Sequence, residues 1–286
     1  MQRGLLLTMA AATLAAIGGV VAADVFSTVD PVVVAQYRSV IAAAVLVPIA
    51  YWRRMTMTGG RLPQLAMFGT VLAALTITFY WSIDRLGVGP GTTLQFTAPV
   101  VVLIWIRFVQ RRAVANRTWL AAGLAVLGTA VMLRAWDLES IDPIGLLAGV
   151  GSMLLYATYL LSAEHLGRRL PDLTIIAYGF AISALIWVVV VPPSIIDAPA
   201  TVWVQIAWVG LMATAVPFLL MVMALSRADS GSVGVVATFE PVVAATAAWI
   251  YLGQSLSWIQ VVGGAMVIWS LVVVQRTVAS AVPASI

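Results

Sequence analysis

Long apolar stretches alternate with short breaks of Gly, Pro and charged residues along the whole chain. A helix needs about 20 consecutive apolar residues to cross a bilayer, and each stretch is close to that length. The breaks, such as Asp30-Pro31 and Asp142-Pro143, are typical of helix boundaries. The pattern predicts an all-α integral membrane protein with ten transmembrane helices, at roughly residues 4–23, 31–51, 63–83, 89–109, 118–136, 143–163, 173–193, 202–224, 232–251 and 258–275.

Composition supports the membrane assignment and narrows the chemistry. The chain is 62% hydrophobic and 9% charged, whereas soluble domains carry about 25% charged residues. It has no Cys, one His (His165) and no Lys. Disulfides, thiolate metal sites, paired-histidine metal or haem sites and lysine Schiff bases are therefore excluded, and we expect no cofactor.

The arginines give the predicted orientation. With a cytoplasmic N-terminus, only Arg85 and Arg134 fall on the outer side, and Arg38 lies inside a predicted helix. The excess of Arg on one side predicts that both termini are cytoplasmic. It also accounts for the net charge of +4 without a nucleic-acid partner. The arginines on the inner side are Arg3, Arg53, Arg54, Arg61, Arg107, Arg111, Arg112, Arg117, Arg168, Arg169, Arg227 and Arg276.

A weak internal repeat divides the chain into two halves. The segment 86–101 aligns with 228–243, which places Pro99 on Pro241, and a Trp opens the following helix in each half. We predict one five-helix repeat in residues 1–138 and a second in residues 139–286. Because five is odd, the two repeats must be inverted in the membrane. Inverted repeats are typical of alternating-access transporters with a substrate site near the midplane.

Two charged residues, Arg38 and Glu240, fall deep inside predicted transmembrane helices, where a charge costs about 2.5–3.5 kcal/mol on insertion scales. Glu240 could pair with an ammonium group or exchange a proton, or it could cap the backbone groups that Pro241 frees. Arg38 could bind a substrate carboxylate, or it could snorkel or pair with Glu240.

Polar and aromatic side chains at membrane depth give further candidates for a substrate cavity. Gln95 and Pro99 are four residues apart on one helix face. A Gln there could bind a zwitterionic ligand or join two helices, and the backbone opened by Pro99 favours the ligand. Pro99 and Pro241 are also predicted helix breaks for gating. Buried aromatic residues are mostly core, but an amphipathic pocket would use some of Tyr80, Phe96, Tyr156, Tyr159, Phe239 and Trp269.

The last two predicted helices carry a recognisable motif. The segment 239–243, Phe-Glu-Pro-Val-Val, is followed by Tyr251-Leu252-Gly253-Gln254-Ser255-Leu256-Ser257, Gln260 and Gly263-Gly264. This run resembles the second repeat of the EamA-type drug/metabolite transporter superfamily, with Gln254 where the family pattern has Glu. Segments 94–99 and 215–218 are most similar to its amino-acid exporters of the threonine/homoserine and aromatic types. The resemblance implies a multi-pass transporter of the bacterial inner membrane.

We therefore expect a secondary transporter, not an enzyme, that exports neutral and aromatic amino acids and related metabolites by alternating access. No nucleotide-binding motif is present in the sequence, and proton coupling or facilitated transport are both open. The alternatives are an exporter of drugs or other metabolites from the same superfamily, a channel, or a membrane scaffold. The expected partners are a small-molecule substrate and the lipid bilayer, and a monomer is compatible with the sequence.

Overall fold

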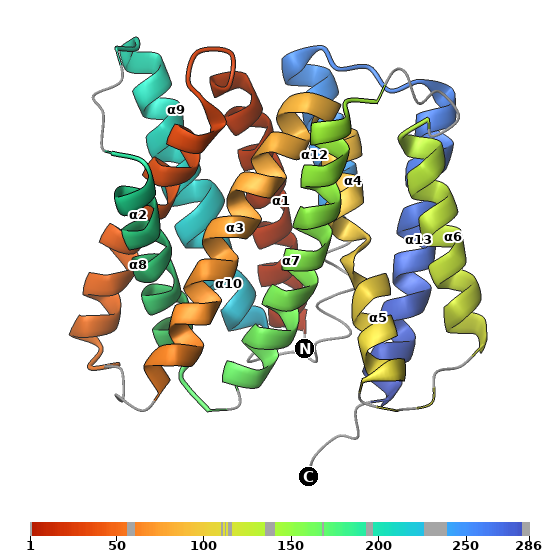
Figure 1. The fold of residues 1–286 in the computed structure, drawn as a ribbon, viewed down its shortest axis with the longest axis horizontal. Helices are drawn as coiled ribbons and strands as arrows, with labels where there is room; N and C mark the ends of the chain where they lie inside the picture. The colour runs from red at the N-terminus through yellow and green to blue at the C-terminus, as the bar shows by residue number, and fades with distance from the viewer. Residues whose placement is uncertain are drawn as a thin grey trace.

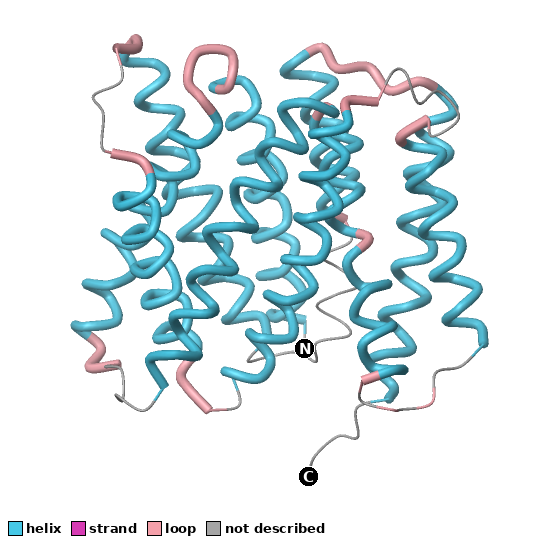
Figure 2. Tube along the Cα trace, viewed as in Figure 1, coloured by secondary structure: helices cyan, strands magenta, loops and turns pink. Residues whose placement is uncertain are grey.

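The computed structural model describes residues 2–55, 61–109, 111, 113, 116–134, 141–167, 169–192, 197–225 and 239–281, and every regular element in these ranges is a helix (Figures 1 and 2). The first half contains α1 (Gln2–Val25), α2 (Pro31–Trp52), α3 (Leu62–Leu86), α4 (Val88–Phe96), α5 (Ala98–Phe108) and α6 (Asn116–Met132). The second contains α7 (Pro143–Gly167), α8 (Asp172–Val190), α9 (Ala200–Gly210), the π-helical turn η3 (Leu211–Ala215), α10 (Val216–Leu225), α12 (Glu240–Leu252) and α13 (Trp258–Ala281).

The helices agree with the predicted membrane segments. Within the described ranges, seven spans are long and apolar enough to cross a bilayer, and three further apolar helices are shorter. Each predicted apolar stretch overlaps one or more of these helices, so the all-α membrane architecture is confirmed. The count of ten spans stays a prediction, because part of the ninth stretch lies in residues 226–238, outside the described residues.

The two halves run in opposite directions. In Figure 1, α1 and α3 rise from the side on which the chain begins, whereas α7 and the α9–η3–α10 segment descend towards it. Contacts between the halves have counterparts in which the two halves swap roles. Helix α3 packs on α7, and correspondingly α1 packs on α9, η3 and α10. Helix α4 packs on α7, and correspondingly α1 packs on α12. Helices α2 and α8 pack on each other, as do α6 and α13. This exchange is what an inverted repeat requires.

Small residues allow the closest of these helix contacts. A Cβ atom built on Gly128 of α6 would lie 2.8 Å from the carbonyl oxygen of Gly263 in α13. The reciprocal Cβ on Gly263 would lie 2.7 Å from the carbonyl oxygen of Gly128. The two backbones therefore touch, which is the packing that small residues allow between membrane helices.

The predicted helix breaks at the two prolines are shifted by a residue or two. The α4–α5 break is at Thr97, and Pro99 lies in the first turn of α5. Likewise Pro241 lies in the first turn of α12, which begins at Glu240 after Phe239. A proline is tolerated in a first turn, because the backbone N–H groups there have no partner within the helix. Glu240 is thus at the start of a described helix, whereas the sequence suggested the middle of one.

Candidate functional site

Arg38 and Tyr80 meet in the interior of the helix bundle. Arg38 comes from the second turn of α2, and its guanidinium carbon lies 5.4 Å from the centre of the Tyr80 ring in α3. Tyr80 is 2% exposed, whereas Arg38 is only partly buried. A cation over a desolvated aromatic face is stabilised by the ring quadrupole.

Thr214 completes this group, and the sequence did not suggest it. Arg38 Nε donates a hydrogen bond of 2.5 Å to Thr214 Oγ1, and the Thr214 hydroxyl donates one of 2.9 Å to the carbonyl of Val209. Thr214 lies in η3, where the helix widens by one residue per turn before Pro217. Pro217 has no N–H for the carbonyl four residues earlier, which favours such a distortion. π-helical turns are frequent at functional sites.

An aromatic cluster lies on the inner face of α7. The rings of Tyr156 and Tyr159 stack with centres 5.8 Å apart. Phe96 of α4 packs 5.4 Å from Tyr156, and Phe218 of α10 packs 5.8 Å from Tyr159. Phe68 of α3 completes the group at 5.6 Å from Tyr159. Three of the predicted aromatic residues, Phe96, Tyr156 and Tyr159, are therefore in contact.

Glu240, the first residue of α12, interacts electrostatically with both the cation and the aromatic cluster. Its carboxyl group is within electrostatic range of both Arg38 and Tyr156. A pair with Arg38 was one of the alternatives that the sequence left open, and Glu240 does not form it. Within the described ranges the one ion pair joins Arg85 to Asp142 at 3.2 Å. Arg38, Tyr156 and Glu240 all keep part of their surface accessible. A carboxyl group and a guanidinium group therefore lie near each other without neutralising each other directly.

Gln95 is buried and bound to a neighbouring helix. The hydroxyl of Ser152 in α7 donates to Gln95 Oε1 at 2.5 Å, and Gln95 is 8% exposed. The sequence left two roles open for Gln95, binding a ligand or joining two helices. In the structure its side chain joins α4 to α7.

The other two aromatic candidates do not join the cluster. Phe239 is 46% exposed, and Trp269 is 70% exposed on α13. Trp269 lies with Leu120 and Leu124 in a shallow groove between α6 and α13. Within the described residues, neither side chain has a ring contact with the cluster of Phe96, Tyr156 and Tyr159.

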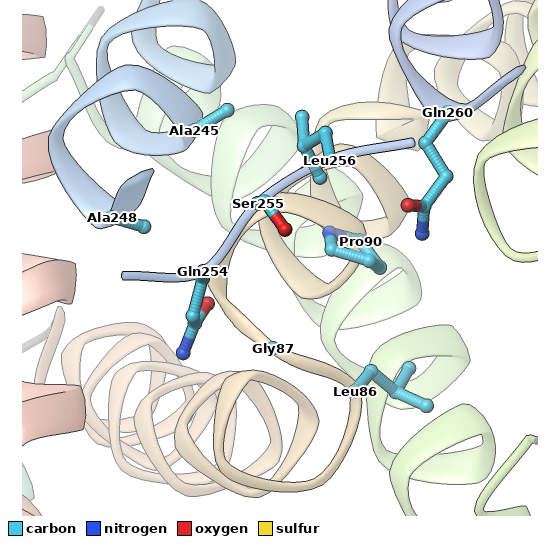
Figure 3. Close-up of a pocket in the computed structure, with 10 residues that line it drawn as sticks. Leu86, Gly87, Pro90, Ala245, Ala248, Gln254, Ser255, Leu256 and Gln260 are labelled. Carbon is cyan, nitrogen blue, oxygen red and sulfur yellow. The ribbon is translucent and has the colours of Figure 1, made fainter. Parts of the chain in front are cut away.

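A pocket of about 230 Å³ lies at the end of the bundle opposite to the start of α1 (Figures 1 and 3). It is lined by residues of the turn from α3 to α4, of the loop from α12 to α13 and of α12, and Figure 3 shows Gln254 reaching towards Gly87. Gln254 Oε1 accepts the backbone N–H of Val88 at 3.1 Å, which caps α4 from the other half of the chain. Gln260 Nε2 donates to the carbonyl of Met132 at the end of α6, at 3.3 Å.

The EamA-like transporter family model matches residues 2–134 and 143–276. The chain belongs to this family. It is 31% identical to the threonine/homoserine exporter RhtA of Escherichia coli (strain K12), over 81% of this chain and 78% of that protein. It is 23% identical to the uncharacterized transporter YwfM of Bacillus subtilis (strain 168), over 90% and 88% of the two chains.

The fold of this EamA-like transporter also occurs in a solved crystal structure. The two align with a TM-score of 0.71 over 98% of each chain at 15% sequence identity. Family membership and the apolar helices together identify a multi-pass membrane transporter. The resemblance inferred from the motif in residues 239–264 is thereby confirmed.

Proposed function

We propose that this transporter exports neutral and aromatic amino acids, with broad specificity, across a bacterial inner membrane by alternating access. Both termini would be cytoplasmic. The threonine/homoserine exporter RhtA, which is 31% identical to this chain, supports this substrate class. The excess of Arg on the side where α1 begins supports the orientation.

One observation carries the proposal. Arg38 and Glu240 interact electrostatically but are not ion-paired with each other. Arg38 contacts Tyr80, Glu240 is in electrostatic range of Tyr156, which stacks on Tyr159, and both halves of the chain contribute to this group. Charges at membrane depth are expensive, and within membrane proteins they usually mark a substrate or ion pathway. Arg38 and Tyr80 come from the first half, and Tyr156, Tyr159 and Glu240 from the second. Relative movement of the halves would change the access to this group from either side.

The chemistry of the group suits a zwitterion with a variable side chain. Arg38 can bind a carboxylate, Glu240 can bind an ammonium group, and the rings of Tyr156 and Tyr159 can contact an aliphatic or aromatic side chain. Glu240 is also the candidate for proton exchange, should export be coupled to a pH gradient. Pro99 and Pro241, each in the first turn after a helix start, are proposed hinge positions for the movement.

The test is transport by the purified protein in liposomes, with labelled threonine, methionine, phenylalanine and tryptophan, with and without a pH gradient. We expect uptake of several of these amino acids, with reduced uptake in Tyr80→Ala and Glu240→Gln. Leu120→Ala, at a position 77% exposed on α6, is the control and should transport like the wild type. If folded wild-type protein takes up none of the four, the proposed function is wrong and family membership alone stands.

A further inference from the structure

The interior cation is held in place by residues of both halves, and this suggests what it binds. We propose that Arg38 binds the carboxylate of the transported substrate, and that Thr214 is a positioning residue that orients the Arg38 guanidinium for this contact. The proposal rests on the amino-acid export proposed above. It adds that the substrate carboxylate is the group recognised by Arg38, and that Thr214 fixes the orientation of Arg38.

The first step is the missing counter-charge. Arg38 has no carboxylate at ion-pair distance within the part of the chain that the structure describes. Its contacts there include the Thr214 hydroxyl and the Tyr80 side chain, which are both uncharged at neutral pH. A cation at membrane depth is stabilised when an anion reaches it, because the low dielectric strengthens their attraction. A substrate carboxylate would supply that anion.

The second step is the orientation of the guanidinium. Thr214 uses the Nε donor, and the ring of Tyr80 lies 5.4 Å from the guanidinium carbon. These contacts fix the plane of the group at two points. A guanidinium carries five N–H donors and the Thr214 bond uses only Nε, so in this proposal Nη donors make the two-point contact that a carboxylate prefers.

The third step is the origin of Thr214's position. Its hydroxyl donates a hydrogen bond to the carbonyl five residues earlier, at Val209, and accepts one from Arg38. The hydroxyl is therefore used both as a donor and as an acceptor. Thr214 is fully buried in the widened turn η3. In a regular α-helix the same hydroxyl would bond a carbonyl three or four residues earlier, as Thr8 does with Gly4. The π-helical turn therefore changes the direction in which Thr214 is presented to Arg38.

Glu240 makes the arrangement specific for an α-amino acid. It lies within electrostatic range of Arg38 but is not ion-paired with it. A ligand that carries an ammonium group next to a carboxylate can contact both side chains at once. A ligand that has only one of these groups leaves the other side chain without a partner, which costs affinity.

The experiment compares substrates with and without the carboxylate. Wild type, Thr214→Val, Thr214→Ser and Thr8→Val are reconstituted in liposomes, and phenylalanine uptake is measured together with its inhibition by phenylalanine amide, which keeps the ammonium group. Thr214→Val keeps the shape of the side chain and removes the hydroxyl. We expect it to raise the KM for phenylalanine about tenfold while inhibition by the amide stays unchanged. Thr214→Ser should restore the wild-type KM.

Thr8→Val is the matched control, because Thr8 is also fully buried and also bonds to a backbone carbonyl, on α1. It should leave both measurements at wild-type values. Arg38→Lys, which keeps the charge but loses the planar fork, should lose the preference for phenylalanine over its amide. Equal changes for phenylalanine and the amide in Thr214→Val, or no change for either, would overturn the positioning role. Absence of any amino-acid uptake by the wild type would instead overturn the proposed function itself.

Discussion

The hydrogen bond between Gln254 and Val88 should hold one end of the bundle closed. It joins the α12–α13 loop of the second half to the first turn of α4 in the first half, at 3.1 Å. Gly87, which precedes α4, offers no side chain to cap it, so Gln254 supplies a partner for an otherwise free N–H. The substitution Gln254→Leu keeps a side chain of similar size and removes this acceptor.

The expected size of the effect follows from a single hydrogen bond. When the halves separate at this end, water can bind the Val88 N–H in both wild type and variant. Gln254→Leu therefore destabilises only the closed arrangement, in which the N–H loses its partner. A typical intramolecular hydrogen bond contributes about 1 kcal/mol net. That corresponds to a factor of about five in the population of the open arrangement, since 1.4 kcal/mol is about tenfold.

Thiol labelling can measure this population, because the chain has no native Cys. Ala248 lines the pocket and is 1% exposed, so a cysteine introduced by Ala248→Cys should react only when this end opens. In nanodiscs, Gln254→Leu should increase the labelling rate about fivefold in this background. Gln254→Glu should slow it at neutral pH, since a carboxylate is a stronger acceptor at a helix N-terminus.

The pH dependence of Gln254→Glu provides an internal check. Contact with the α4 N-terminus favours the ionised form, which lowers the pKa of the introduced carboxyl below its ordinary value of about 4.3. The slowing should therefore persist at neutral pH and disappear as the pH falls through that lowered pKa. Ser255→Ala, in the same loop and exposed, is the control and should not change the rate. Identical labelling rates for wild type and Gln254→Leu would refute the reasoning.

Two further predictions concern stability. Gly69→Ala would place a Cβ 2.6 Å from the side chain of Ile182, whereas carbon atoms in contact lie about 3.5–4.0 Å apart. It should therefore cost about 1–3 kcal/mol and lower the unfolding temperature in detergent. The control Gly123→Ala, where no atom lies within 4 Å, should keep the wild-type temperature, and equal temperatures for the two variants would contradict this packing. The backbone N–H of Gly145, 2.7 Å from Asp142, lowers the pKa of that carboxyl, with help from its ion pair. The stabilisation is present above the ordinary Asp pKa of about 3.9 and is lost as the pH falls through the lowered pKa. Acid should therefore shift the unfolding temperature of wild type more than that of Asp142→Ala. Parallel curves of unfolding temperature against pH would count against the contact between Asp142 and the Gly145 N–H.

Hydropathy predicted the helices well because the bilayer imposes a length on each apolar segment. Residues 143–163, for example, were predicted to span and lie within α7. Helix ends are less constrained, which is why Glu240 and Pro241 lie in a first turn and not in the middle of a described helix. A membrane helix is apolar both on its lipid-facing side and on its protein-facing side. The sequence pattern therefore could not tell that Trp269 faces outward while Tyr80 faces inward.

The candidate site was predicted residue by residue, but its contacts were not. Arg38, Tyr80, Tyr156 and Glu240 were singled out because each is polar at membrane depth. Thr214 was missed because a single Thr in an apolar helix is ordinary, and its partner is 176 positions away. Pro217, three residues later, is the local signal for the widened turn that presents it.

The backbone contact between Gly128 and Gly263 has a consequence for the biogenesis of the protein. Helix α6 is synthesised well before α13, the helix on which it packs. During that interval its glycine-containing face would meet lipid. A small apolar face has no large penalty in lipid, because membrane helices gain little from hydrophobic burial against one another. Helix α6 can therefore insert first and acquire its partner only when α13 leaves the ribosome.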